Sequence, residues 1–259
     1  PSDYIEANNT PGWTNIQGEF WREGGIAPDL ELAEVMPRFT EEAVSVIRDH
    51  GAGDLERPLM LYLAYPAPHT PWLPTEAFRG KSGAGIYGDF VHMVDHQIGA
   101  VVDAIDKAGM AEDTLLIFTA DNGPVWYDED VEKFDHDSSG GLRGMKADAW
   151  ENGHRMPFIV RWPGKVKAGS VSDATICFTD IFKTLADITD SVVPVGQAPD
   201  SESFLAVLDG TQKEGEPVRG PIALEAGRGH FMIRSGDWKL ITGPESGGFS
   251  KMDKAAVRE

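Results

Sequence analysis

Two short, continuous runs of apolar residues flank a long amphipathic segment, and this arrangement limits the fold more than any other feature of the sequence. Residues 59–64 (Leu-Met-Leu-Tyr-Leu-Ala) and 114–119 (Thr-Leu-Leu-Ile-Phe-Thr) are typical of strands buried on both faces. Between them, apolar residues recur at helical spacing from Tyr87 to Ile105. Strand, helix and strand in this order predict a βαβ unit with a right-handed crossover. The chain is therefore predicted to be an α/β protein.

Other segments extend this pattern. Apolar residues at helical spacing predict helices over residues 31–50 and 179–189, and residues 158–162, followed by Pro-Gly, predict a third strand. Residues 1–29 are rich in Gly, Pro, Asn and Trp and lack a clear period, which favours an extended loop. We expect this loop to pack through its aromatic residues Trp13, Phe20 and Trp21.

The composition shifts after residue 190 toward Pro, Gly, Ser and Asp. Two short β-like runs follow, at 221–224 and 230–241. We therefore expect two parts: the C-terminal portion of an α/β domain over residues 1–190, and the start of a small C-terminal α+β subdomain over residues 191–259.

The chain is acidic, with 42 Asp and Glu against 23 Lys and Arg among 259 residues, a formal net charge of −19. This charge argues against nucleic acid or an anionic membrane as a partner, because like charges repel over most of the surface. An anionic small substrate stays compatible, since a local cation reverses the field in one pocket. No apolar run reaches the ~18 residues of a spanning helix. A single cysteine excludes an internal disulfide, and we interpret Cys177 as a buried core thiol.

Polar side chains follow both predicted strands at the edge where α/β sheets bind ligands. His69 follows the first strand, and Asp121 and Asn122 follow the second. Asp and Asn supply the hard oxygen donors that Ca²⁺ or Mg²⁺ prefers, although an Asp-Asn-Gly triplet alone is more typical of a turn. Lys146 lies in a Gly-rich segment that suits an oxyanion, although such a lysine alone favours a solvated loop. Together the four residues predict a metal-and-cation pocket at one edge of the sheet.

Four motifs occur in an order that resembles the type I sulfatases, the formylglycine-dependent, arylsulfatase-like branch of the alkaline phosphatase superfamily. They are Ala-Pro-His-Thr-Pro at 67–71, Phe-Thr-Ala-Asp-Asn-Gly-Pro at 118–124, Leu-Arg-Gly-Met-Lys at 142–146 and Glu-Asn-Gly-His-Arg-Met-Pro at 151–157. Residues 231–240 also resemble the C-terminal region of that family. The resemblance implies an α/β/α sandwich that hydrolyses sulfate esters.

The resemblance also implies roles for individual residues. Asp121 and Asn122 match two ligands of the active-site cation, usually Ca²⁺ and with Mg²⁺ as the alternative. Lys146 matches the lysine that contacts the sulfate, and His69 matches a histidine beside the sulfate and the leaving-group oxygen. His136, in the loop between the metal-ligand and lysine motifs, is a candidate for substrate contact, with ordinary loop polarity as the alternative.

The sequence departs from the family pattern. The family's formylglycine is made from a Cys/Ser-x-Pro-x-Arg motif, which this chain lacks, and the paired aspartates of the family's first strand are also missing. Asn152 and Ala147 stand where the family often has Gly. The chain starts at Pro1, without a Met or a visible signal peptide, so we interpret it as a fragment whose nucleophile lies upstream. We expect weak Ca²⁺ binding and no turnover from the fragment alone.

Three alternatives stay open at this stage. His92 and His96 have a spacing that binds Zn²⁺ from one helical face, although a solvated face is the simpler interpretation. A phosphate or phosphonate ester hydrolase of the same superfamily would carry a different nucleophile or metal, and a non-catalytic relative would bind a sulfated glycan without cleaving it. The expected substrate is a small-molecule or glycan sulfate ester, and the resemblance favours a periplasmic or extracellular location. The oligomeric state is not predicted.

Overall fold

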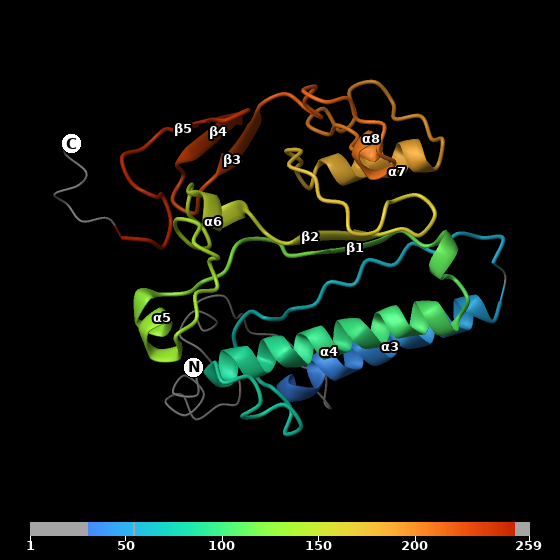
Figure 1. Ribbon diagram of the computed structural model, residues 1–259, viewed down its shortest axis with the longest axis horizontal. Helices are drawn as coiled ribbons and strands as arrows, with labels where there is room; N and C mark the ends of the chain where they lie inside the picture. The colour runs from blue at the N-terminus through green and yellow to red at the C-terminus, as the bar shows by residue number, and fades with distance from the viewer. Residues whose placement is uncertain (1–30, 54, 252–259) are drawn as a thin grey trace, which may run out of the picture. The chain divides into compact units, whose positions relative to one another are not determined.

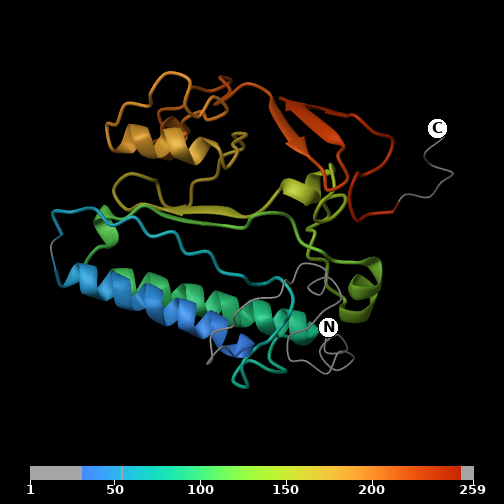
Figure 2. The same ribbon diagram turned by 180° about the vertical axis from the view of Figure 1, so that it is seen from behind.

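The computed structural model describes residues 31–53 and 55–251, and the chain divides into two compact units. The first unit comprises residues up to Ala111 together with Glu129–His136, and the second comprises Glu112–Asp128 and all residues from Asp137 onward. Figures 1 and 2 show the elements of both units from opposite sides. The predicted loop over residues 1–29 lies outside the described residues.

Two long helices form the first unit. A 3₁₀ turn, η1 (Leu32–Glu34), leads into α3 (Val35–Gly51), and α3 packs along α4 (Gly85–Lys107), as both views show. Both predicted helices, over 31–50 and from Tyr87 to Ile105, are confirmed. The core between them contains buried apolar side chains of both helices: Met36, Phe90, Met93 and Val94. The unit also includes most of the short helix α5 (Asp128–Phe134).

The predicted strand over residues 59–64 is wrong. This segment joins no sheet in the described part of the chain, and Met60 and Tyr62 are 79% and 85% exposed. An apolar run indicates that a segment tends to be buried. A strand also needs a neighbouring strand whose backbone N–H and C=O groups pair with its own. The predicted βαβ unit with its right-handed crossover is therefore not formed by these residues.

The second unit begins with a two-stranded ribbon that follows the turn η2 (Ala111–Asp113). Strand β1 (Leu116–Thr119) pairs antiparallel with β2 (Phe158–Arg161), in a register that places Thr119 opposite Phe158. The strands predicted over 114–119 and 158–162 are thus confirmed, with shorter bounds. Because β1 ends where β2 begins, the loop after β1 lies beside the segment that precedes β2.

A three-stranded antiparallel sheet forms the C-terminal part of the second unit. Its order is β3 (Ile222–Glu225), β4 (Phe231–Ser235) and β5 (Trp238–Ile241), which confirms both predicted β-like runs. Residues of this sheet and its turn, Ala226 and Met232, share a core with Ala149 from the segment before β2. The sheet therefore packs against the segment that follows Lys146. The predicted division of the chain near residue 190 stays a prediction.

Helix α7 (Asp180–Ile188) confirms the helix predicted over 179–189, and the short helix α8 (Leu205–Leu208) follows it. Asp180 is fully buried and accepts hydrogen bonds from the backbone of Cys177 and Glu202 and from the guanidinium of Arg219. Cys177 is half-buried rather than a buried core thiol. None of the helices in the described part of the chain combines the length and the apolar character needed to cross a membrane.

Candidate active site

Asp121 and Asn122 lie in the loop that follows β1, beyond the C-terminal end of the strand. Asp121 is exposed, so its carboxylate is accessible to a ligand. The amide nitrogen of Asn122 donates to the carbonyl of Gly123 at 3.0 Å. This hydrogen bond uses the nitrogen end of the amide, so the carbonyl oxygen is the end that could coordinate a cation.

Lys146 lies in a loop between this segment and β2, and backbone hydrogen bonds join the two loops. The amide of Lys146 donates to the carbonyl of Pro124 at 2.8 Å, and the amide of Gly123 donates to the carbonyl of Gly153 at 3.1 Å. The structure therefore brings the predicted cation ligands and the predicted sulfate-binding lysine into one loop pair within the second unit. Asp121, Asn122 and Lys146, three of the four predicted residues, thus lie on loops joined by backbone hydrogen bonds, and their joint action on one ligand stays a prediction.

The loop that carries Lys146 is held by two buried polar side chains. The Asp148 carboxylate accepts from the amides of Met145 at 2.8 Å and Ser250 at 3.1 Å. The Asn152 side chain donates to the carbonyl of Gly144 at 2.7 Å. Asn152, which the sequence shows only as a mild departure from the family pattern, thus closes the loop around Lys146.

Glycine at position 123 is required by the close approach of α6 (Glu151–His154). A Cβ atom at Gly123 would overlap the carbonyl oxygen of Asn152. We expect Gly123→Ala to lower the free energy of unfolding by about 3 kcal/mol, because the backbone of two loops has to move apart. Chemical unfolding measures this difference. Gly220→Ala is the matched control, since its Cβ meets nothing within 4 Å, and equal effects for both variants would contradict the close packing.

A group of charged residues adjoins α6. Lys239 of β5 donates to the imidazole of His154 at 2.8 Å and to the carbonyl of Ala149 at 3.1 Å, and it forms an ion pair with Glu151. Burial and then the Lys239 charge lower the pKa of His154 to about 4, so this imidazole is neutral at pH 7. Burial opposes ionisation of Glu151, but Lys239 and Arg234 outweigh it and lower the pKa of this carboxyl. Burial likewise lowers the pKa of Lys239, against the attraction of Glu151.

His69 belongs to the first unit, where it lines a hollow of about 320 Å³ beside the start of α3. The walls of this hollow are mainly apolar and include Met36 and Phe90. His69 is exposed, and its Nδ1 lies 2.8 Å from the carbonyl of Thr70. As the donor in this bond, Nδ1 leaves Nε2 as the ring nitrogen available for proton transfer. Because His69 and Lys146 belong to different units, the joint pocket stays a prediction.

The remaining histidine candidates lie in the first unit too. His136 is exposed directly after α5, and its contact with substrate stays a prediction. His92 and His96 both pack against the ring of Phe78, at 5.5 and 5.3 Å between ring centroids. Among the residues that the structure describes, no three His, Cys, Asp or Glu side chains group as a metal site requires.

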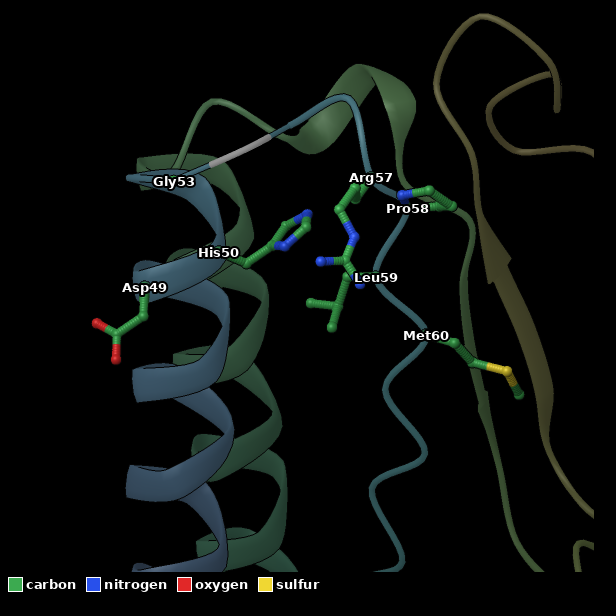
Figure 3. Close-up of a pocket in the computed structure, with 7 residues that line it drawn as sticks. All are labelled: Asp49, His50, Gly53, Arg57, Pro58, Leu59 and Met60. Atoms are coloured by element: carbon green, nitrogen blue, oxygen red, sulfur yellow. The ribbon is translucent and has the colours of Figure 1, made fainter.

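A second hollow of the first unit lies at the C-terminal end of α3 and contains none of the predicted site residues. Figure 3 shows the side chains of His50 and Arg57 turned toward each other there, while Asp49 points away. The segment with Pro58 and Leu59 forms its other wall. We therefore assign no role in the proposed site to this hollow.

Fold and site together define an α/β protein that presents two oxygen donors and a lysine from adjoining loops. The sulfatase family model matches residues 7–191. A curated N-acetylgalactosamine-6-O-sulfatase of Bacteroides thetaiotaomicron is 35% identical over 229 residues, covering 85% of this chain and 43% of the relative. Human steryl-sulfatase is 33% identical over 192 residues, covering 74% of this chain and 32% of the relative. The chain belongs to the sulfatase family.

Solved structures agree with this assignment. A sulfatase from a study of glycosaminoglycan metabolism by Bacteroides thetaiotaomicron superposes with a TM-score of 0.74 at 35% identity, covering 82% of this chain and 44% of that one. A Pseudoalteromonas sulfatase superposes with a TM-score of 0.70 at 25% identity, covering 92% of this chain and 51% of that one. The α/β fold class is confirmed, and the chain spans less than half the length of the curated relatives described above.

Proposed function

We propose that this chain is part of a sulfuric ester hydrolase that acts on a small-molecule or glycan sulfate ester. The observation that carries the proposal is the hydrogen-bonded loop pair, which holds Lys146 beside the segment of Asp121 and Asn122. Membership of the sulfatase family supports the choice of a sulfate ester over other anionic substrates.

The donor set of the loop after β1 fits part of a calcium site. The exposed Asp121 carboxylate and the carbonyl oxygen of Asn122 are adjacent hard donors, one charged and one neutral. We propose that these two residues hold Ca²⁺, with Mg²⁺ as the alternative. A bound divalent cation would polarise the sulfate oxygens. Two protein ligands do not complete a calcium shell, so the isolated chain is expected to bind the ion weakly.

Lys146 and His69 have separate tasks in the proposed reaction. The ammonium group of Lys146 binds a sulfate oxygen and stabilises the negative charge that develops during transfer. His69, when protonated, donates the Nε2 proton to the departing alkoxide or phenoxide, while the bond from Nδ1 to Thr70 fixes the ring. His136 is proposed as a substrate contact from the loop after α5.

The chain itself has no residue that suits the formylglycine of type I sulfatases, because it contains no Cys/Ser-x-Pro-x-Arg motif. We propose that the part of the protein that precedes Pro1 supplies this nucleophile. Coverage of only 43% of the bacterial relative supports that arrangement.

We expect the full-length protein to hydrolyse an aryl sulfate such as 4-methylumbelliferyl sulfate, and the isolated 259-residue chain to give no measurable turnover. A fluorescence assay of both proteins tests this, with 4-methylumbelliferyl phosphate as the matched substrate. Preferential cleavage of the phosphate ester would contradict a sulfatase, and turnover by the isolated chain would contradict an upstream nucleophile.

A further inference from the structure

Each of the three hydrogens of the Lys239 ammonium group has an acceptor. Its side chain, on β5, is only 15% exposed. It donates to the carbonyl of Ala149, to the ring of His154 and to the carboxylate of Glu151. All three acceptors lie in residues 149–154, directly after the loop of Lys146. One side chain from the C-terminal sheet thus binds this segment at three points.

The same segment contacts both loops of the proposed site, the loop of Asp121 and Asn122 and the loop of Lys146. The carbonyl of Gly153 accepts a hydrogen bond from the amide of Gly123, the residue that follows Asn122 in the sequence. The Asn152 side chain, in the same segment, donates to the carbonyl of Gly144, two residues before Lys146. Movement of α6 would therefore displace the Asp-Asn loop and the lysine loop together.

The charges around Lys239 favour this arrangement at neutral pH. Glu151 also lies 3.5 Å from Arg234 and 3.7 Å from Arg155, so its carboxylate faces three cations. The low pKa of His154 keeps its ring neutral, which lets Nε2 accept a hydrogen from Lys239. A protonated ring would offer no acceptor there.

We propose that Lys239 is a positioning residue for the sulfate site: it fixes α6 and thereby the relative position of Lys146 and the Asp121–Asn122 pair. Its effect on catalysis rests on the proposed function, whereas the coupling of the two loops does not. The C-terminal sheet is in this way part of the site's support, although none of its residues carries a proposed catalytic role.

Hydrogen exchange at two amides tests the coupling without an activity measurement. In Lys239→Met, the amides of Lys146 and Gly123 should exchange at least about 10-fold faster than in the wild type, while amides of α7 keep their rates. Loss of the Lys239 charge should also raise the pKa of His154 above its value of about 4, as read from NMR titration of the ring. Unchanged exchange at both amides in the folded variant would overturn the proposal.

Two variants complete the test. Glu151→Gln keeps the side-chain size and weakens the bond to Lys239, so it should speed exchange at the same amides and serves if Lys239→Met fails to fold. Lys183→Met removes a half-buried lysine that is paired with Glu202 at 3.7 Å and should leave both amides unchanged. Equal effects from Lys183→Met and Lys239→Met would show a general loss of stability instead of positioning.

Activity measurements on the full-length protein distinguish a failure of this proposal from a failure of the proposed function. In an active sulfatase, Lys239→Met should lower kcat by about 10-fold or more with a smaller change in KM, because misplaced groups lose transition-state contacts. Wild-type kcat in this variant would overturn the catalytic effect. A wild type without sulfatase activity would refute the proposed function, and the exchange rates would still decide whether Lys239 positions the loops.

Discussion

Lys146→Ala in the full-length protein is expected to lower kcat/KM for a sulfate ester by about 100- to 1,000-fold, the usual loss when one preorganised donor to a developing charge is removed. Asp148 and Asn152 fix the loop that carries Lys146, so the backbone from which the lysine side chain extends is held in place before the substrate binds. Steady-state kinetics with an aryl sulfate measures the loss.

Two further variants show whether this loss is specific. Lys146→Arg keeps the charge but changes the donor geometry, so its activity should lie between that of Lys146→Ala and the wild type. Lys165→Ala removes an exposed lysine of the same unit and should leave kcat/KM within about twofold, as for most surface changes. Activity of Lys146→Ala within a few-fold of the wild type would refute the role of this lysine.

Asp180→Ala is expected to produce the largest loss of stability, about 3–5 kcal/mol, because it leaves a charge without its partner in the interior. Asp180 is fully buried, and Arg219 donates to it at 2.6 Å with a side chain that is only 8% exposed. Removal of the carboxylate also takes an acceptor from the amides of Cys177 and Glu202. The change in the free energy of unfolding is measured by urea titration.

The exposed pair of Asp103 and Lys107 supplies the matched control. Both side chains are mostly exposed and lie 3.6 Å apart, so Asp103→Ala should cost less than about 1 kcal/mol. Replacing both buried partners, in Asp180→Leu with Arg219→Met, should recover part of the loss because no unpaired charge remains. A cost for Asp180→Ala as small as that for Asp103→Ala would contradict a buried ion pair.

Local patterns predicted most of the helices and strands. The apolar spacing that predicts helices over 31–50 and 87–105 reflects a packing face that a helix carries within its own sequence. Residues 59–64 show the limit of this reasoning, because a strand also depends on a partner elsewhere in the chain. The antiparallel pairing of β1 with β2 is likewise set by residues about 40 positions apart, which no local period records.

The same distinction applies to the candidate site. Asp121, Asn122 and Lys146 stand in short motifs, so their chemistry could be predicted from residue type and order. Asp148 and Asn152 are close in sequence to Lys146, but their role depends on burial, which the motifs do not show. Lys239 contacts His154 across 85 positions, and no sequence signal links the two.

A double-mutant cycle on Asp121 and Lys146 tests most directly whether both loops act on one sulfate group. If both side chains stabilise the same transition state, Asp121→Ala combined with Lys146→Ala should lose far less kcat/KM than the product of the single losses. We expect the kcat/KM of the double variant to be close to that of the less active single variant. Losses that multiply independently would contradict a shared site.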